Sequence, residues 1–235
     1  MPTMQSFVCD RYKLLMIEKA VNLATDALTI ILMRADFAQV VPFNTKYYVK
    51  RINVNGNSGA IGLTFSNTPA KITRAAGNFW TAGFAPGNYI TTNSANPANQ
   101  GPFLVYDIDL VGPGLWMQIV DLTGADPTLT AGVEAAITIT FEDQLPTAGG
   151  YVQDANGMSA YAAVQYDTGG YAYIDFDPVN FGLAMMGDIA PTAGALIWDD
   201  DAAADEIVGF FDFGGNESST WPDYLTVGNM RFKIA

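Results

Sequence analysis

The sequence contains no histidine and a single cysteine, Cys9, among its 235 residues. A disulfide within the chain is therefore impossible, and a zinc site built from cysteine and histidine is excluded. Catalytic pairs of the Ser-His or Cys-His kind are excluded for the same reason. A lone cysteine near the start of the chain is typical of a small buried apolar side chain. We predict no catalytic residues, no metal site and no cofactor.

Long apolar runs are also lacking. No stretch of about 18 apolar residues is present, so we expect no membrane partner. The first residues show no basic region followed by an apolar run and a small-residue cleavage site, which a secretory signal would have. We therefore expect the protein to be made in a cytoplasm and to stay there, and we interpret the sequon Asn216-Glu217-Ser218 as coincidental.

Charged residues make up only 15% of the chain, and the lysines and arginines are confined to residues 1–74 and to positions 231 and 233. Residues 1–74 hold nine lysines and arginines and four acids, whereas residues 75–230 hold twenty acids and no cation; the net charge is −13. Because an acidic surface repels nucleic acid, we expect no nucleic-acid partner. The basic first third could face an acidic partner, and unspecific drift of surface charge is an equal alternative.

Frequent glycine, threonine, asparagine and aromatic residues favour a β-rich fold. Apolar residues at helical spacing predict a helix over 8–23, and the run 27–33 predicts a buried strand. The turn Asn55–Gly59 predicts a hairpin between the strands 47–54 and 60–66. The other expected β segments are 76–92, 102–112, 115–122, 136–141, 161–167, 171–177, 193–199, 206–213 and 229–235.

Five carboxylates lie within eight residues, between the two predicted strands 193–199 and 206–213; they are Asp199, Asp200, Asp201, Asp205 and Glu206. Aspartate favours turns, so a solvated acidic hairpin loop is the simplest interpretation. An EF-hand is disfavoured because Ala203 and Ala204 stand where that loop needs an oxygen ligand and a glycine. Weak calcium binding and a glycosidase carboxylate pair remain alternatives of low specificity.

The chain is rich in aromatic residues that could line a platform for a sugar. The candidates are Trp80, Phe84, Tyr89, Trp116, Trp198 and Trp221. Packing in a core or an interface is the default interpretation for such side chains. No phosphate-binding Gly-rich loop of the P-loop pattern is present, and single-stranded nucleic acid would need cations interleaved with the aromatics.

Three segments carry a resemblance to a known family. They are Thr25-Asp26-Ala27-Leu28-Thr29-Ile30, Leu196-Ile197-Trp198-Asp199-Asp200 and Ile207-Val208-Gly209-Phe210-Phe211-Asp212-Phe213-Gly214-Gly215. With them the chain resembles small virion proteins of tailed bacteriophages. In that family an N-terminal helix leads into a T-D-x-I-x-V-x-L strand, and an A-x-I-Y-D-D…L-I-G-Y-I-D-F-G-G hairpin follows in the C-terminal half. The likeness covers about residues 5–40 and 150–235.

The middle of the chain departs from that pattern and carries a second resemblance. Gly83-Phe84-Ala85-Pro86-Gly87-Asn88-Tyr89-Ile90 and Asn99-Gln100-Gly101-Pro102-Phe103 resemble a small β unit of phage tail and virion proteins with a G-F-x-P-G-D-x-I…N-N-G-x-F signature. Asn88 stands where that unit usually has an acid.

These resemblances imply a mainly β protein of two modules. Residues 1–48 and 142–235 would form a discontinuous β-sandwich-like domain with an N-terminal helix, and residues 49–141 an inserted β module. The ends of an inserted domain lie close together, so Val49 and Phe141 should be neighbours.

The function implied is that of a non-enzymatic virion structural protein. Among such proteins, we expect a capsid decoration or auxiliary protein that binds the assembled shell as a homo-oligomer. Its partners would be the major capsid protein or other virion proteins, and its place the virion, assembled in the host cytoplasm. A tail or neck component is the alternative; a further one is a host-surface glycan-binding module that uses Trp80, Trp116 or Trp221.

Overall fold

The structure, a computed structural model, consists of β-strands and loops in the part of the chain that it describes. That part comprises residues 5–8, 26–35, 55–109, 113–153, 157–158, 163–166, 172–182, 187–199, 206–223, 225–228 and 230–234. It contains no α-helix and a short 3-10 turn, η1 (Pro97–Asn99), so the mainly β prediction is confirmed. The chain divides into unit 1, residues 1–35, 48–51 and 144–235, and unit 2, residues 36–47 and 52–143.

The predicted N-terminal helix is not supported. Its first residue, Val8, ends a strand, β1 (Gln5–Val8), and the remainder, 9–23, lies outside the described residues. Strand β1 pairs antiparallel with β16 (Glu206–Ser219), with Phe7 opposite Phe210. Aromatic and β-branched residues favour a strand once a partner supplies the hydrogen bonds. That partner lies at the other end of the chain, where local helical spacing cannot reveal it.

The main sheet of unit 1 has the strand order β1-β16-β15-β2-β11. Strand β2 (Leu28–Arg34) lies between β15 (Ile189–Asp199) and β11 (Gly157–Met158), and five of its seven residues are buried. A strand that is flanked by neighbours and covered on both faces has a continuous apolar sequence rather than an alternating one. The buried strand predicted over 27–33 is therefore confirmed.

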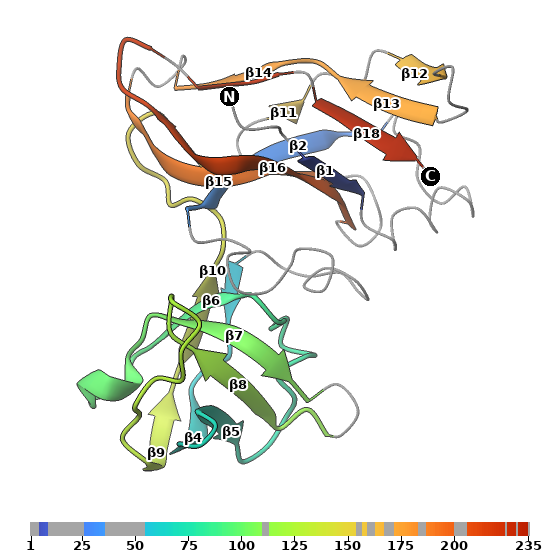
Figure 1. Cartoon of the computed structure of the whole chain (residues 1–235). Helices are drawn as coiled ribbons and strands as arrows, with labels where there is room; N and C mark the ends of the chain where they lie inside the picture. Colours follow the sequence, from blue (N-terminus) through green and yellow to red (C-terminus); the bar gives the residue numbers. More distant parts are fainter. Residues whose placement is uncertain are drawn as a thin grey trace. The chain divides into compact units, whose positions relative to one another are not determined.

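Two smaller sheets complete unit 1 (Figure 1). One has the order β12-β13-β18, formed by Ala163–Tyr166, Ala172–Phe176 and Met230–Ile234, which confirms three of the predicted strands. The other pairs β14 (Val179–Phe181) with β17 (Leu225–Val227), which the sequence did not predict. Strand β18 contacts β1, so the small sheet lies against the main one.

Unit 2 is a sheet that closes on itself. Its strand order is β3-β10-β6-β7-β8-β5-β4-β9. Strand β9 runs into β10 across Thr138 alone, and β3 runs into β4 across residues 58–60; β3 pairs with β10 and β4 with β9. The two ends of the order thus belong to one long bent ribbon, and the sheet forms a barrel. The strands are Asn55–Asn57, Ile61–Ser66, Lys71–Arg74, Tyr89–Thr92, Phe103–Ile108, Trp116–Val120, Gly132–Ile137 and Ile139–Glu142.

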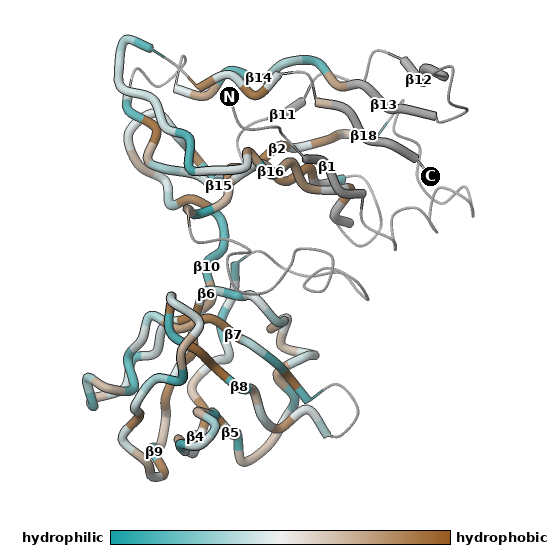
Figure 2. Tube along the Cα trace, viewed as in Figure 1, coloured by the Kyte–Doolittle hydropathy of each residue, from teal (hydrophilic) through white to brown (hydrophobic). Residues whose placement is uncertain are grey.

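The barrel has its own apolar core, which follows the alternation of its strands. Three aromatic rings meet inside it: the ring centroids of Phe79 and Phe84 lie 5.6 Å apart, and those of Phe84 and Phe141 lie 4.8 Å apart. All three side chains are fully buried. Figure 2 shows the apolar composition along β7 and β8. The other buried apolar residues of this core are Leu63, Phe65, Ala70, Ile72, Ile90, Phe103, Val105, Ile108, Met117, Ile119, Leu129, Ile137 and Ile139.

The hairpin predicted at Asn55–Gly59 is wrong. Asn55 to Asn57 form strand β3 instead, with Gly56 opposite Phe141 of β10. A Cβ atom at Gly56 would lie 2.7 Å from both Cε1 and Cζ of Phe141, so the glycine serves a close approach of a ring to the backbone rather than a turn. Asn55 lies opposite Glu142, so the first and last described strands of unit 2 are neighbours. Val49 lies outside the described residues.

The contact between Gly56 and Phe141 predicts the effect of adding one methyl group. Gly56→Ala is expected to lower the free energy of unfolding by about 1–3 kcal/mol, because the fully buried ring must move. Gly62→Ala is the matched control. This glycine lies on β4, the next strand along the chain, and a Cβ there would have nothing within 4 Å. Urea denaturation of both variants checks the prediction, and equal stabilities would contradict it.

Candidate binding face

The acidic segment singled out in the sequence is the end of a hairpin. Strands β15 and β16 pair antiparallel up to Asp199 opposite Glu206, which confirms the two predicted strands. Residues 200–205 lie outside the described residues. Asp199 itself is fully buried, because it ends a strand flanked by β2 and β16. The solvated-loop interpretation is therefore wrong for Asp199.

The six candidate aromatic residues do not form one platform. Phe84 lies in the barrel core, and Trp80 packs against that core. Trp221 is 42% exposed and belongs to unit 1, where its backbone N–H donates to the Asp188 carboxylate. Tyr89 is half-buried on β6. The Trp198 side chain lies outside the described ones. Tyr89 and Trp116 are the two candidates on the outer side of the barrel strands, since Ile90 and Met117 beside them are in the core. Of the two, Trp116 has a cation against its ring.

Trp116 faces outward because its neighbours in β8 face inward. Met117 and Ile119 are buried in the barrel core, and the alternation of a strand places Trp116 and Gln118 on the opposite side. Strand β8 lies between β5 and β7. Thr73 of β5 is opposite Trp116, while Gln118 has Lys71 of β5 on one side and Asp107 of β7 on the other.

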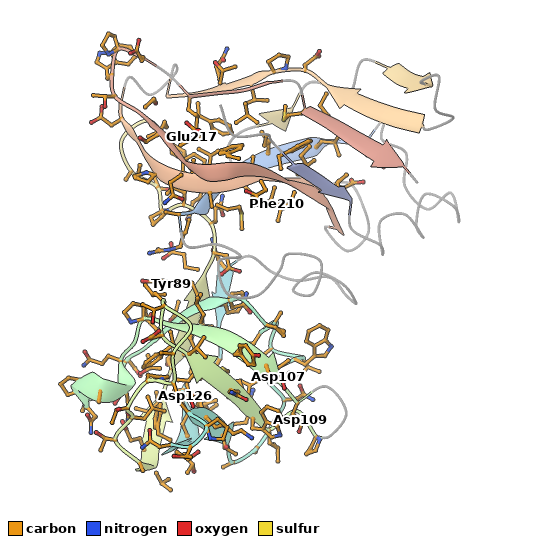
Figure 3. The ribbon with its side chains drawn as sticks, in the orientation of Figure 1. Tyr89, Asp107, Asp109, Asp126, Phe210 and Glu217 are labelled. Atoms are coloured by element: carbon orange, nitrogen blue, oxygen red, sulfur yellow. The ribbon has the colours of Figure 1, made fainter. Side chains whose placement is uncertain are left out.

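These outward residues form a compact surface, which we call the Trp116 face: Lys71, Thr73, Asp107, Trp116 and Gln118. The Lys71 Nζ lies 4.2 Å from the centroid of the Trp116 ring. One Asp107 carboxylate oxygen accepts from its neighbour's backbone N–H, that of Ile108, at 2.8 Å. Asp107 is exposed at the end of β7 (Figure 3).

Three polar side chains of the Trp116 face have no hydrogen-bonding partner among the described residues. No hydrogen bond or ion pair joins the side chains of Lys71, Thr73 or Gln118 to any residue in the described part of the chain. Lys71, Gln118 and Asp107 place donors and acceptors in a row across the three strands β5, β8 and β7. The sequence named Trp116 as a candidate but missed its four companions, because they come from separate strands and follow no local motif.

Elsewhere in the barrel, hydrogen bonds of buried polar side chains hold the loops against the strands. The Asp143 carboxylate accepts from the Asn88 side-chain amide and from the Tyr89 backbone N–H, each at 2.8 Å. An amide at position 88 can donate to Asp143, which a carboxylate could not do. The departure of Asn88 from the acid of the phage signature thus has a structural reason.

A second hydrogen-bond network joins the loop before β7 to strand β9. The Glu134 carboxylate accepts from the Ser94 hydroxyl at 2.7 Å and from the Asn99 amide at 2.6 Å. Asn99 also exchanges hydrogen bonds with the backbone of Thr130. These groups are occupied by one another, which is typical of a structural network rather than of a reactive site.

The buried cation of unit 2 also fastens a loop. The Arg74 guanidinium donates to the Ala76 carbonyl at 2.6 Å and its Cζ lies 5.1 Å from the Phe79 ring centroid. Burial lowers its pKa below the ordinary value. The pKa of Asp121 is also below its ordinary value, because its carboxylate accepts from the Thr123 hydroxyl and the Ala125 backbone in its own turn. A carboxylate held in this way is a poor general acid.

Comparisons with protein-family models, with curated proteins and with solved structures find no match. The described residues contain no group of three or more acids, cysteines or histidines placed to hold a metal ion. The same part of the chain has no helix with the length and hydropathy to cross a bilayer. Any function is therefore argued from the sequence motifs and the geometry of this chain.

Proposed function

We propose that the chain is a non-enzymatic structural protein of a tailed-phage virion, a decoration or auxiliary protein that binds the assembled capsid as an oligomer. The β15–β16 hairpin carries this proposal. The motif segments that resemble phage virion proteins lie in these paired strands over residues 196–199 and 207–215, with Leu196 opposite Phe210 and Ile197 opposite Gly209. The third motif segment, 25–30, runs into β2, the other neighbour of β15.

The proposed architecture is a β-sandwich-like attachment domain that carries an inserted barrel. The contact between β1 and β18 supports a second layer over the main sheet of unit 1. The pairing of β3 with β10 supports insertion, because a domain can be inserted into a strand-rich host only if its two ends lie together. The separate apolar core of the barrel supports a module that folds as a body of its own.

In this proposal unit 1 binds the shell, and the barrel is displayed. The partners are the major capsid protein or other virion proteins, and a homo-oligomer would match the symmetry of a capsid site. The barrel segment 52–143 holds seven acids and two cations, and this net negative charge suits a surface in water, since it keeps particles apart. A tail or neck component is the alternative form of the same function, and it differs in copy number and symmetry.

Immunogold electron microscopy of purified particles tests the proposal. Antibody is raised against the barrel, and the control is a phage in which residues 55–142 are replaced by a short Gly-Ser linker. The linker can join the ends because Asn55 and Glu142 are opposite each other. We expect gold over the head of the parent particles and none on the control.

Other labelling patterns have definite meanings. Gold confined to the tail or neck would replace decoration by the alternative form. Absence of label, together with absence of peptides of this chain in a mass-spectrometric digest of the particles, would overturn the virion proposal.

A second candidate function is binding of a glycan on the host surface. The Trp116 face favours it, because a half-buried indole lies among polar groups that the described part of the chain leaves unbonded.

A further inference from the structure

We infer that the Trp116 face is a binding site for a neutral glycan chain, with Trp116 as the stacking ring and Lys71, Thr73, Gln118 and Asp107 as its hydrogen-bonding partners. This deepens the second candidate function, on which it rests, and does not depend on the virion proposal.

The groups match a sugar because a sugar ring has two kinds of surface. Its flat C–H faces stack on aromatic side chains, and its rim of hydroxyls both donates and accepts. Trp116 provides the aromatic surface. Beside it, Lys71 donates, the Asp107 carboxylate accepts, and the Gln118 amide does both. Because Lys71, Gln118 and Asp107 are cross-strand neighbours, they repeat at the strand spacing of about 4.8 Å, which a rigid chain of hydroxyls can follow.

The charge of the face selects a neutral chain over an acidic one. Lys71 and Asp107 flank Gln118, so their row carries no net charge. Residues 52–143 contain seven acids and two cations, of which Arg74 is buried. A polyanion would be repelled by the surrounding barrel, and a basic protein would find no acidic cluster on this face. An uncharged polyhydroxyl ligand meets neither penalty.

The strands beneath the face are also fixed before a ligand arrives. Ile72 in β5, Met117 and Ile119 in β8, and Val105 in β7 anchor the strands in the barrel core. The backbone beneath the site therefore needs little ordering when a ligand binds, which favours affinity.

Lys71 has a double role in this site. Its ammonium lies over the Trp116 ring and holds the indole in place while the site is empty. A stacking sugar takes the position over the ring, and the ammonium turns to a hydroxyl at the edge. Lys71→Met therefore keeps the stacking surface and removes one donor, so we expect it to weaken binding less than the loss of Trp116.

Affinity electrophoresis of the full chain through gels that contain a soluble polysaccharide tests the inference. The neutral probes are dextran, mannan, laminarin and xylan, and the acidic probes are alginate and hyaluronan. We expect at least one neutral probe to retard the protein and neither acidic probe to do so. Trp116→Ala should weaken the retardation about tenfold or more. Trp221→Ala, at an exposed tryptophan of unit 1, is the matched control and should leave it unchanged.

Gln118→Ala guards against a folding defect in the Trp116 variant, because it removes a half-buried polar group with no bond to the described residues. It should weaken binding severalfold while the thermal unfolding curve stays in place. Several results would overturn the inference: no retardation by any neutral probe, retardation by the acidic probes only, or equal loss with Trp221→Ala. Analytical ultracentrifugation can give one further contradicting result. If Trp116→Ala dissociates an oligomer and no probe binds, the face is an interface between copies of the chain.

Discussion

Asp143→Ala is expected to lower the free energy of unfolding of the barrel by about 2–5 kcal/mol. The carboxylate is 1% exposed and accepts hydrogen bonds from the Asn88 amide and the Tyr89 backbone N–H. Alanine would leave both donors buried without this acceptor. Each such donor loses water on folding and gains nothing in return, so the penalty exceeds the value of an ordinary exposed hydrogen bond.

Hydrogen exchange read by mass spectrometry checks this prediction, because it reports on segments of each unit separately. Peptides from β6 and β10 should lose protection in the Asp143 variant, while peptides from β2 and β15 keep it. Asp126→Ala is the control, since Asp126 is exposed on the same unit (Figure 3). Asp143→Asn should have an intermediate effect, because its amide offers one acceptor to two donors. Unchanged protection in Asp143→Ala would contradict the proposed role of the carboxylate.

Phe84→Ala is expected to cost the barrel about 3–5 kcal/mol, the usual loss for a phenylalanine removed from a packed core. Phe84 is fully buried between Phe79 and Phe141, with an edge-on contact to the first and a tilted contact to the second. Removal of the central ring leaves a cavity and breaks both ring contacts. Tyr106→Ala on β7 is the matched aromatic control, because Tyr106 is 50% exposed.

Chemical denaturation of the two variants gives the comparison. The double variant Phe84→Ala/Phe141→Ala tests the contact between the two rings. The stability losses of the two single variants should add up to more than the loss in the double variant, and the difference, the coupling energy, should be about 0.5–3 kcal/mol. Strictly additive losses, or a Tyr106 variant as unstable as the Phe84 variant, would show that the three rings do not form the centre of this core.

The local sequence predicted the strands whose surroundings require a recognisable order of residues, such as a continuous apolar run. The apolar run 27–33 was recognised because β2 is covered on both faces and flanked on both edges. The segments 193–199 and 206–213 were recognised because a short acidic stretch of sequence separates two apolar runs, and adjacent strands pair with each other. By contrast, the helix predicted from Val8 onward began on the last residue of β1, since the partner strand β16 lies at the far end of the chain.

Other features depend on contacts that no local pattern contains. The Asn-Gly pair at 55–56 has the composition of a turn, but the Phe141 ring needs the space of a Cβ at Gly56. Asn88 departs from the motif, and its amide donates to Asp143, 55 residues away in the sequence. The short strand β5 has only four residues and gains its stability from β4 and β8 on either side.

The sequence by itself determined which chemistry this protein lacks and that it is built of strands. Without histidine and with one cysteine, whole classes of catalytic and metal sites are excluded whatever the fold. Only the tertiary structure decided that the barrel closes and that Lys71, Gln118 and Asp107 lie in one row beside Trp116. The physical reason is that strand pairing joins residues far apart along the chain, and the register of each pair sets which side chains share a face.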